Sequence, residues 1–336
     1  MPRFQPPFGQ APITVGILMP VFDATVVITT RDRREDVRLA LMSCVSQTDV
    51  RLEILVYDDA SSDGTESMVH SEFSDVRVFR SVDRLGYIAL RNRGFRDARS
   101  PIVISLDDDA LFTSPKTVAQ VVEAFRVTPN AAAFALKYRE TQSQNKLALM
   151  PEMPTGSELR SYIGCSHAVR KDIVLSLGGY REFFVHQGEE KDLCIRMRNK
   201  GYSIQFLNCP AIIHNPSSKR DHRRWHYFGI RNTFLFTLLN VPTGYAVFRL
   251  GKDTLLLLRH SVRTSGLQGL WWVMKGLVSS LRYLPNREPV RTETYRQYHR
   301  LVSAGPSGIA LQSECCMCAT GAGDSGSANK GVINTR

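Results

Sequence analysis

The sequence predicts an α/β fold with a mostly parallel central sheet, helices on both faces and a helical extension at the carboxyl end. Three observations support this prediction. Short β-branched runs alternate with helical apolar spacing from Ala24 to Asp109, which is typical of strands joined by right-handed crossovers. Two of these strands end in acidic residues, and open α/β sheets bind ligands beyond the carboxyl ends of their strands. After Trp225 the apolar spacing is helical.

Composition divides the chain into four segments. Residues 1–23 are rich in Pro and are expected to form a loose leader. Residues 24–225 hold the alternating strands and helices, and residues 226–302 form a basic helical region. Residues 303–336 are rich in Gly, Ser and Ala, so we expect a disordered tail.

The 336 residues are 43% hydrophobic, which is enough for a full core and excludes a disordered protein. The formal net charge of +11 is concentrated between Arg196 and Arg300, where 18 Lys or Arg accompany four acidic residues. Such a basic segment indicates an anionic partner. Nucleic acid, an anionic membrane surface and a phosphate-bearing substrate all fit this description.

Seven cysteines are scattered without a disulfide framework, which is typical of a reducing compartment. The amino terminus has no charged segment followed by an apolar one, so we expect no signal peptide. We therefore expect a cytoplasmic protein, either free or peripheral on the cytoplasmic face of the inner membrane. The sequence indicates no oligomeric state.

Each element of the first half follows from local pattern. β-branched runs predict strands, and apolar residues at helical spacing predict the helices between them. Asp63 or Thr65 can cap the second helix. The expected strands are 25–29, 52–56, 76–79 and 102–106, and the expected helices are 39–47, 65–69 and 89–95.

The fourth expected strand ends in Asp107, Asp108 and Asp109. Adjacent carboxylates raise one another's pKa unless a cation neutralises them or water screens them. A hard divalent ion such as Mg²⁺ or Mn²⁺ prefers oxygen ligands. The triplet therefore predicts a metal site, with a solvated turn that caps the helix near Pro115 as the alternative.

Four stretches of the chain resemble the signatures of family 2 glycosyltransferases, in the order of that family. They are Val26–Thr30, Asp58–Thr65, Arg91–Gly94 and Leu106–Asp109. The resemblance spans about residues 24–232 and implies the GT-A fold, a Rossmann-like arrangement. It also implies a nucleotide-sugar donor of the UDP, GDP or dTDP type, a metal held through a DXD motif, and inversion at the anomeric carbon.

The second half of the α/β segment is less regular. A loop over residues 141–154 is expected to be mobile over the site. The Gly178-Gly179 pair ends a short helix, and a further helix begins at Gly188. The expected strands are 131–136, 163–169, 203–207 and 211–213, and the expected helices are 118–125, 173–177 and 188–200.

Glu189, Glu190 and Asp192 lie in the first turn of the helix that begins at Gly188. Acidic residues at a helix start suit the helix dipole, so simple capping explains them. They can also supply a catalytic carboxylate. By resemblance this is the Glu-Asp-x-Asp-Leu motif, whose second position supplies the base. Glu190 occupies that position here, with Glu189 and Asp192 as alternatives.

The resemblance also implies roles for the remaining candidate residues. His214 follows an expected strand, and a histidine in that position is often structural. Family members, however, often place a histidine near here against the metal or the diphosphate. The cluster Lys219–Arg224 is either a solvated face or a lid over the diphosphate. The implied cofactor-binding residues are Thr30, Arg31, Asp59, Arg91, Asn92, Asp107 and Asp108, and the implied metal ligands are Asp109, Asp107 and His214.

None of the helical runs after Trp225 reaches 18 uncharged residues, so we expect no spanning helix. Basic residues interleave with Leu, Phe and Trp, which favours a peripheral membrane face. Ordinary packing of a helical subdomain on the core explains the same pattern. The basic residues are Arg249, Lys252, Arg259, Arg263, Lys275 and Arg282.

With these candidate residues, the resemblance implies an inverting hexosyl- or deoxyhexosyltransferase that acts on a glycan or lipid-linked acceptor, and we expect a role in cell-surface polysaccharide or glycolipid synthesis. A nucleotidyltransferase is one alternative, but Arg31–Arg34 lacks the glycines of its phosphate-binding loop. A basic nucleic-acid-binding protein is another, but it leaves the acidic strand ends unexplained. We therefore expect no nucleic-acid partner.

Overall fold

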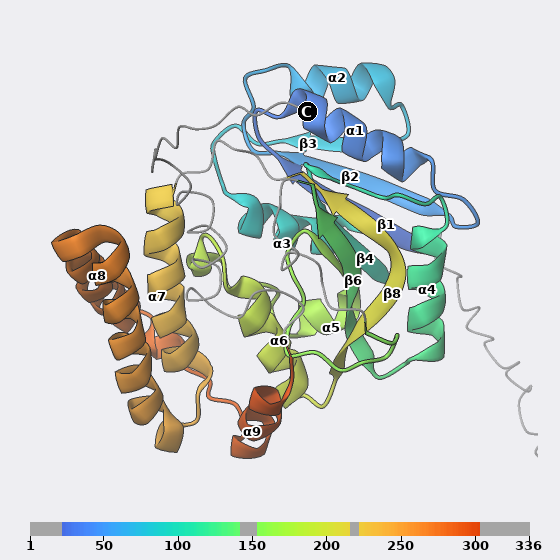
Figure 1. The fold of residues 1–336 in the computed structure, drawn as a ribbon. Coiled ribbons are helices and arrows are strands. Elements are labelled where there is room, and N and C mark those ends of the chain that lie inside the picture. Colours follow the sequence, from blue (N-terminus) through green and yellow to red (C-terminus); the bar gives the residue numbers. More distant parts are fainter. Residues whose placement is uncertain (1–21, 142–152, 216–221, 303–336) are drawn as a thin grey trace, which may run out of the picture.

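The computed structural model describes residues 22–141, 153–215 and 222–302. Its central sheet has the strand order β3-β2-β1-β4-β7-β6-β8-β5 (Figure 1). The strands are β1 (Ala24–Thr30), β2 (Leu52–Asp58), β3 (Arg77–Arg80), β4 (Ile102–Asp107), β5 (Ala110–Leu111), β6 (Ala131–Glu140), β7 (Ser166–Arg170) and β8 (Ser203–His214).

The first four strands of this order are parallel, as the sequence predicts. Thr30 of β1 pairs with Asp58 of β2, and Thr29 pairs with Asp107 of β4. The carboxyl ends of β1, β2 and β4 therefore meet at one edge of the sheet. β-Branched side chains within these strands, such as Val27 and Val103, are buried, because both faces of a parallel sheet are covered.

The other half of the sheet is mixed. β7 is antiparallel to both β4 and β6, β8 is parallel to β6, and β5 is antiparallel to β8. The expected strands 203–207 and 211–213 are one strand, β8. Its pairing with β6 jumps from Leu136 opposite Leu207 to Tyr138 opposite Ile212, so β8 carries a bulge. Pro210, which has no N–H for the ladder, lies in this bulge.

Helices cover both faces of the sheet, which confirms the predicted architecture. Figure 1 shows α1, α2 and α4 on one face and α3, α5 and α6 on the other. These helices are α1 (Arg34–Val45), α2 (Thr65–Glu72), α3 (Tyr87–Asp97), α4 (Thr117–Val127), α5 (Lys171–Ser176) and α6 (Glu189–Asn199).

A helical region follows the sheet, as predicted, and consists of α7 (His222–Asn240), α8 (Thr243–Leu281) and α9 (Thr292–Arg300). Gly266 has a non-helical backbone with φ of 57° and divides α8 into two arms. The arms pack closely, because a Cβ atom on Gly269 would lie 2.1 Å from the carbonyl oxygen of Ser261. α8 is therefore a helical hairpin, and it lies beside α7 (Figure 1).

One expected segment boundary lies inside a helix, and parts of other expected segments lie outside the described residues. The expected break between residues 225 and 226 falls inside α7, which begins at His222. Residues 1–21, 142–152, 216–221 and 303–336 lie outside the described residues, and with them most of the leader, the expected loop, Lys219, Arg220 and the tail. No helix in the described ranges is both long and apolar enough to cross a bilayer.

Close packing of α3 on β1 gives the first prediction. A Cβ atom on Gly94 would lie 2.5 Å from Cγ1 of the buried Val27. Overpacking of this kind costs about 1–3 kcal/mol, which exceeds the gain of up to about 1 kcal/mol in helix propensity. We expect Gly94→Ala to lower the free energy of unfolding in urea.

Gly251→Ala is the matched control, because no atom lies within 4 Å of its added Cβ. It should leave the protein as stable as the wild type or slightly more stable. A Gly94→Ala protein with wild-type stability would contradict the packing argument.

Candidate active site

The acid triplet is neutralised in part by Arg33. Nη1 of Arg33 donates hydrogen bonds to Asp108 (3.0 Å) and Asp109 (2.8 Å). Desolvation nevertheless raises the pKa of the Asp108 carboxyl to about 7. Burial also acts to raise the pKa of Asp109, but the hydrogen bonds and charges of His214 and Arg33 together outweigh it, and the pKa falls below its usual value. The triplet is thus a buried, partly compensated acidic site rather than a solvated turn.

Arg91 of α3 connects the triplet to the start of α6. Its guanidinium is 4% exposed and donates to Asp107 Oδ1 and to the carbonyl oxygen of Gly164. On the other side its Nη1 lies 3.7 Å from Oε1 of Glu189. Desolvation acts against its charge, but Asp107 together with smaller contributions from neighbouring groups outweighs it and raises the pKa of Arg91. One buried cation therefore joins the two acidic clusters that the sequence identifies.

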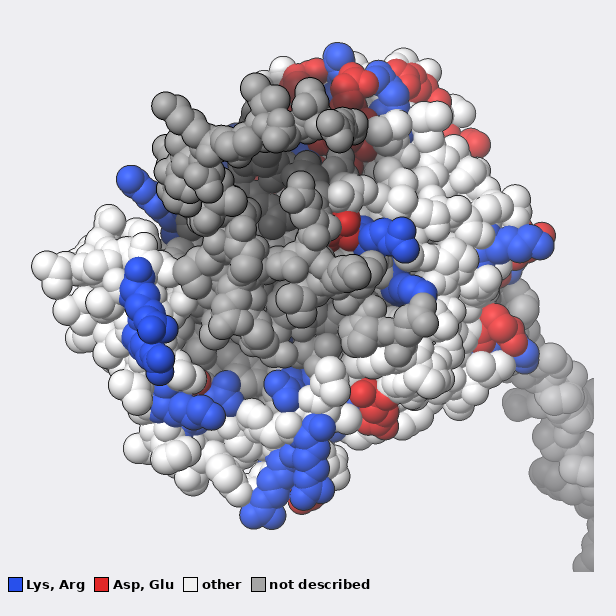
Figure 2. Space-filling model, viewed as in Figure 1, with Lys and Arg blue, Asp and Glu red and all other residues white. Residues whose placement is uncertain are grey.

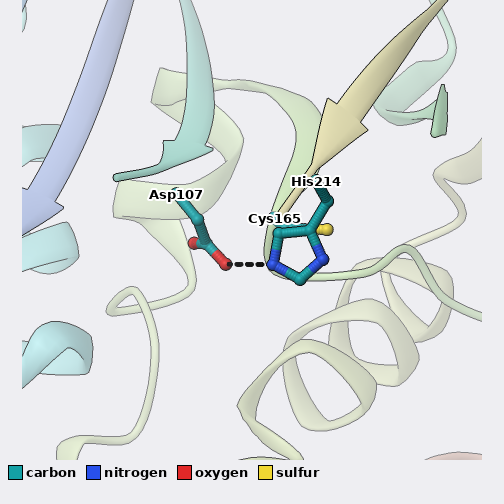
Figure 3. A group of neighbouring side chains, drawn as sticks. All are labelled: Asp107, Cys165 and His214. Carbon is teal, nitrogen blue, oxygen red and sulfur yellow. Dashed lines mark ion pairs between the residues drawn. The ribbon is translucent and has the colours of Figure 1, made fainter. Parts of the chain in front are cut away.

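His214 completes the arrangement at the strand ends. Its Nε2 lies 3.2 Å from Asp109 Oδ1 and 4.0 Å from Asp107 Oδ2, and its Nδ1 lies 3.4 Å from Glu140. Cys165 also faces this group, and a ligand atom from each of Asp107, Cys165 and His214 lies within 4.8 Å of the others (Figure 3). The structure thus brings together the three residues expected as metal ligands.

The short strand β5 explains why His214 reaches the triplet. Ala110, directly after the triplet, pairs with His214 at the end of β8. Sequence analysis did not find this strand, because two residues carry no periodic pattern. It also missed Arg33, Glu140 and Cys165 as neighbours of the acids.

The donor atoms fit a hard divalent cation. Carboxylate oxygens and an imidazole nitrogen suit Mn²⁺ or Mg²⁺, and Glu140 can hold the ring from its other nitrogen. Desolvation acts to lower the pKa of His214, but hydrogen bonds with Asp109 and Glu140 and the charges of Asp107 and Asp109 together outweigh it and raise the pKa to about 10. A metal takes the neutral ring in place of that proton. Burial raises the pKa of the Cys165 thiol well above its usual range, so Cys165 borders the site as a neutral thiol.

Glu189 and Glu190 have different environments. Glu189 is fully buried, and neither of its carboxylate oxygens has a hydrogen-bond partner in the described part of the chain. Burial raises the pKa of Glu189 to about 8, so it is largely neutral at pH 7. Glu190 is half-buried, and a Cβ atom on Gly164 would lie 2.7 Å from its Oε1. Gly164 therefore leaves space for the Glu190 carboxylate.

Asp192, the third acid of this turn, supports the fold. It is fully buried and accepts hydrogen bonds from Arg181 (2.8 Å), Arg196 (2.9 Å) and Asn240 (2.8 Å). These bonds join α6 to α7 and occupy both carboxylate oxygens. Of the three acids considered as the base, Asp192 therefore has the geometry least suited to that role.

Two expected cofactor-binding residues, Asn92 and Asp59, form hydrogen bonds with backbone groups. The Asn92 amide accepts from Tyr180 N–H (2.9 Å) and donates to Tyr180 carbonyl oxygen (2.8 Å). Asp59 accepts from the backbone N–H of Leu85 (2.6 Å) and Gly86 (3.1 Å). Both side chains fix the segments next to α3 and α5. A motif match locates such residues, but it does not show which partner their polar atoms take.

The remaining expected residues lie at the same sheet edge. Thr30 is buried at the end of β1, and Arg31 is exposed and forms an ion pair with Asp32 (3.4 Å). Desolvation lowers the pKa of Arg84, and the charges of Arg31 and Arg224 lower it further. Arg31 and Arg224, from two other segments, are therefore near enough to Arg84 for their charges to repel it. Sequence analysis noted Arg31 and Arg224 but not Arg84.

The fold and the first part of the chain resemble known glycosyltransferases. Residues 25–176 match the family model for Glycosyl transferase family 2. The structure of S. aureus TarS residues 1–349 is 14% identical with a TM-score of 0.57, over 82% of this chain and 90% of that one. Its complex with UDP-GlcNAc gives a TM-score of 0.59 over 83% of each chain, at 14% identity. These matches establish the α/β fold of the GT-A enzymes.

A mannosyltransferase from Pyrobaculum calidifontis, solved with GDP-Man and Mn²⁺, is 16% identical with a TM-score of 0.51, over 89% of this chain and 86% of that one. Among curated relatives, the uncharacterized protein y4gI of Sinorhizobium fredii is 24% identical over 64% of this chain. An uncharacterized glycosyltransferase of Haemophilus influenzae is 27% identical over 32% of this chain. The matches span 27% and 35% of those two relatives.

The buried carboxyl of Glu189 gives a prediction on stability. Its pKa of about 8 in the folded protein exceeds the value of about 4.3 in an unfolded chain. The folded state holds the proton more tightly, so the free energy of unfolding falls as the pH rises between these two values. Glu189→Gln keeps the shape and removes the titration. We therefore expect the wild type to lose stability in urea, relative to Glu189→Gln, from about pH 5 to about pH 8.

Glu123→Gln is the control, because a hydrogen bond from Arg126 lowers the pKa of that exposed carboxyl. Its stability relative to the wild type should not change above pH 5, since its titration lies below that value. A Glu189→Gln difference that is constant from about pH 5 to pH 8 would show that Glu189 is ionised throughout.

Proposed function

We propose that the protein transfers a sugar from a nucleoside-diphosphate-sugar to an acceptor hydroxyl with inversion, and that Glu190 is the general base. One observation carries the proposal. Asp107, Asp109 and His214 converge at the strand ends, and Arg91 connects that group to the turn that holds Glu190. A metal-binding group beside a half-buried carboxylate is the arrangement that such a transfer requires.

The comparisons support the proposed donor class. Solved proteins with this fold carry UDP-GlcNAc in one case and GDP-Man with Mn²⁺ in another. The match to Glycosyl transferase family 2 covers β1 to α5, including the acid triplet. We propose a hexosyl or deoxyhexosyl donor and a glycan or lipid-linked acceptor of the cell surface.

In this proposal the residues of the site have separate roles in binding the metal and accepting the proton. Asp107, Asp109 and His214 would hold Mn²⁺ or Mg²⁺, which when bound neutralises the charge of a diphosphate leaving group. Glu190 accepts the proton of the acceptor hydroxyl as the new bond forms, and no covalent sugar-enzyme intermediate is needed. Burial keeps Glu189 protonated beside it, so a second negative charge does not oppose the charge on Glu190.

The positions of the basic residues favour this proposal over the alternative of a nucleotidyltransferase. Arg33, in the loop after β1, is bound to Asp108 and Asp109. It does not form the free phosphate-binding loop that a nucleotidyltransferase needs. The arginines at 31, 84 and 224 lie instead where they can attract a diphosphate, because guanidinium groups bind phosphate oxygens in pairs of hydrogen bonds.

The donor can be identified by thermal stabilisation. A ligand that binds the folded state stabilises it by mass action, so one sugar nucleotide from a UDP, GDP and dTDP panel should raise the Tm in the presence of Mn²⁺. The same compound should then be consumed when acceptors are supplied. A panel without any stabilising sugar nucleotide would contradict the proposed donor class.

Replacement of Glu190 tests the base. Glu190→Gln keeps the size of the side chain and removes its proton affinity. We expect kcat to fall by about a hundredfold or more, with unchanged donor affinity in the thermal assay. Glu189→Gln, in which a neutral carboxyl becomes a neutral amide, should keep most of the activity. The reverse result, an active Glu190→Gln and an inactive Glu189→Gln that binds donor, would make Glu189 the base.

Replacement of Asp109 tests the metal site. We expect transfer to stop in excess EDTA and to return with Mn²⁺, and Asp109→Asn to lose nearly all transfer. Asp36→Asn is the matched control, because Asp36 also pairs with Arg33 (3.0 Å) but lies outside the triplet. It should keep its activity and Mn²⁺ response. Full wild-type activity in EDTA would show that no metal is required.

A further inference from the structure

The helical hairpin α8 exposes an unusual number of large apolar side chains. Phe248 and Val247 are each 79% exposed, and Leu267 is 85% exposed. The other exposed apolar residues of the first arm are Leu255, Leu256 and Val262. Those of the second arm are Leu270, Trp271, Met274, Val278 and Leu281. Exposed apolar clusters of this kind mark interaction surfaces.

These side chains form stripes at helical spacing. Phe248, Leu255 and Val262 recur every seven residues on the first arm, which places them on one face of that helix. The opposite positions, Leu257 on the first arm and Val273 on the second, are buried with Ile230 and Phe234 of α7. The hairpin thus buries one set of apolar residues against α7 and leaves a second set without cover in the described structure.

The charge of this surface is of one sign. The only acid in α8 is Asp253, which is buried and accepts hydrogen bonds from Arg249 (2.8 Å) and Thr237 (2.7 Å). White and blue atoms predominate on the lobe at the left of Figure 2. The exposed basic residues among the stripes are Lys252, Arg259, Arg263 and Lys275, with Arg282 directly after the helix.

We propose that the α8 hairpin docks on an anionic lipid bilayer. Its aliphatic and aromatic side chains would enter the headgroup region, while Lys and Arg would contact lipid phosphates. Lys275 already lies 4.6 Å from the ring centre of Trp271 and 5.3 Å from that of Tyr227, an aromatic and basic combination suited to this interface. Because no helix in the described ranges can span a bilayer, the hairpin lies on the surface.

Charge complementarity favours lipid over a second copy of the chain. A dimer through the same stripes would bury the apolar side chains, but it would bring the Lys and Arg residues of two hairpins together with no exposed acid on α8 to compensate. Like charges in contact oppose such an interface. An anionic membrane satisfies both the apolar and the basic residues.

The hairpin packs on α7, and α7 is hydrogen-bonded to the segment that precedes α6 of the candidate active site. Asn232 of α7 donates hydrogen bonds to the backbone oxygens of Phe184 (2.9 Å), His186 (2.7 Å) and Gln187 (2.7 Å), which directly precede α6. A docked hairpin would therefore hold the site at a fixed position relative to the bilayer. Binding itself does not depend on the transfer reaction, so it can be tested without a donor.

Vesicle sedimentation with the full chain tests the proposal. We expect binding to phosphatidylcholine vesicles that contain phosphatidylglycerol, weak binding to phosphatidylcholine alone, and release at high salt because screening removes the attraction. The triple variant Lys252→Glu, Arg259→Glu, Arg263→Glu should bind at least tenfold more weakly. The double variant Phe248→Ser, Trp271→Ser should also bind at least tenfold more weakly.

Val82→Ser is the matched control, since Val82 is 95% exposed but lies between β3 and α3. It should bind like the wild type. All the replaced side chains are exposed, and wild-type Tm values would show that the variants fold. Equal binding by the triple variant, or no binding of the wild type to either vesicle, would overturn the proposal. A dimer that the double variant dissociates, without vesicle binding, would assign the surface to a second copy instead.

Discussion

The buried guanidinium of Arg91 is the interaction on which the rest of the site depends. A cation removed from water costs several kcal/mol unless acids surround it. Here Asp107 at the end of β4 supplies a negative charge, and on the other side the carboxyl of Glu189, at the start of α6, lies 3.7 Å from the guanidinium. The carbonyl oxygen of Gly164 and the ring of Tyr87, 4.8 Å from the guanidinium carbon, complete its surroundings. Arg91 therefore connects the sheet to α6 through groups that also form the site.

The carboxylates of the acid triplet are likewise compensated by nearby basic side chains. Each of its carboxylates contacts at least one basic side chain, and these side chains come from three parts of the fold. Asp107 has Arg91, Asp108 has Arg33, and Asp109 has both Arg33 and His214. The low exposure of these groups makes each pairing stronger than it would be in water. The loop before α1, helix α3 and strand β8 must all be in place before the triplet can be buried.

Local pattern was sufficient for part of this architecture. The parallel strands, the acids at their ends, the turn at Gly188 and the helices after Trp225 follow from alternation, helical spacing and capping chemistry. The reversed strand β7 and the two-residue strand β5 were not predictable, because tertiary pairing defines them. The same holds for Arg33, whose partners lie 75 and 76 positions away. Asn92 lies in a recognised motif, yet its amide binds a residue 88 positions away.

The bulge in β8 sets the orientation of His214. From the pair Leu136–Leu207 to the pair Tyr138–Ile212, β6 advances by two residues while β8 advances by five. Side chains on a strand alternate between faces, so an odd excess of residues reverses the face on which the next ones lie. The number of residues in this bulge therefore decides whether the imidazole faces the acids. Surface loops commonly accept insertions and deletions. In the β8 bulge, however, an insertion or deletion of one residue would turn His214 away from the acids, so substitutions are tolerated there far more readily than changes in length.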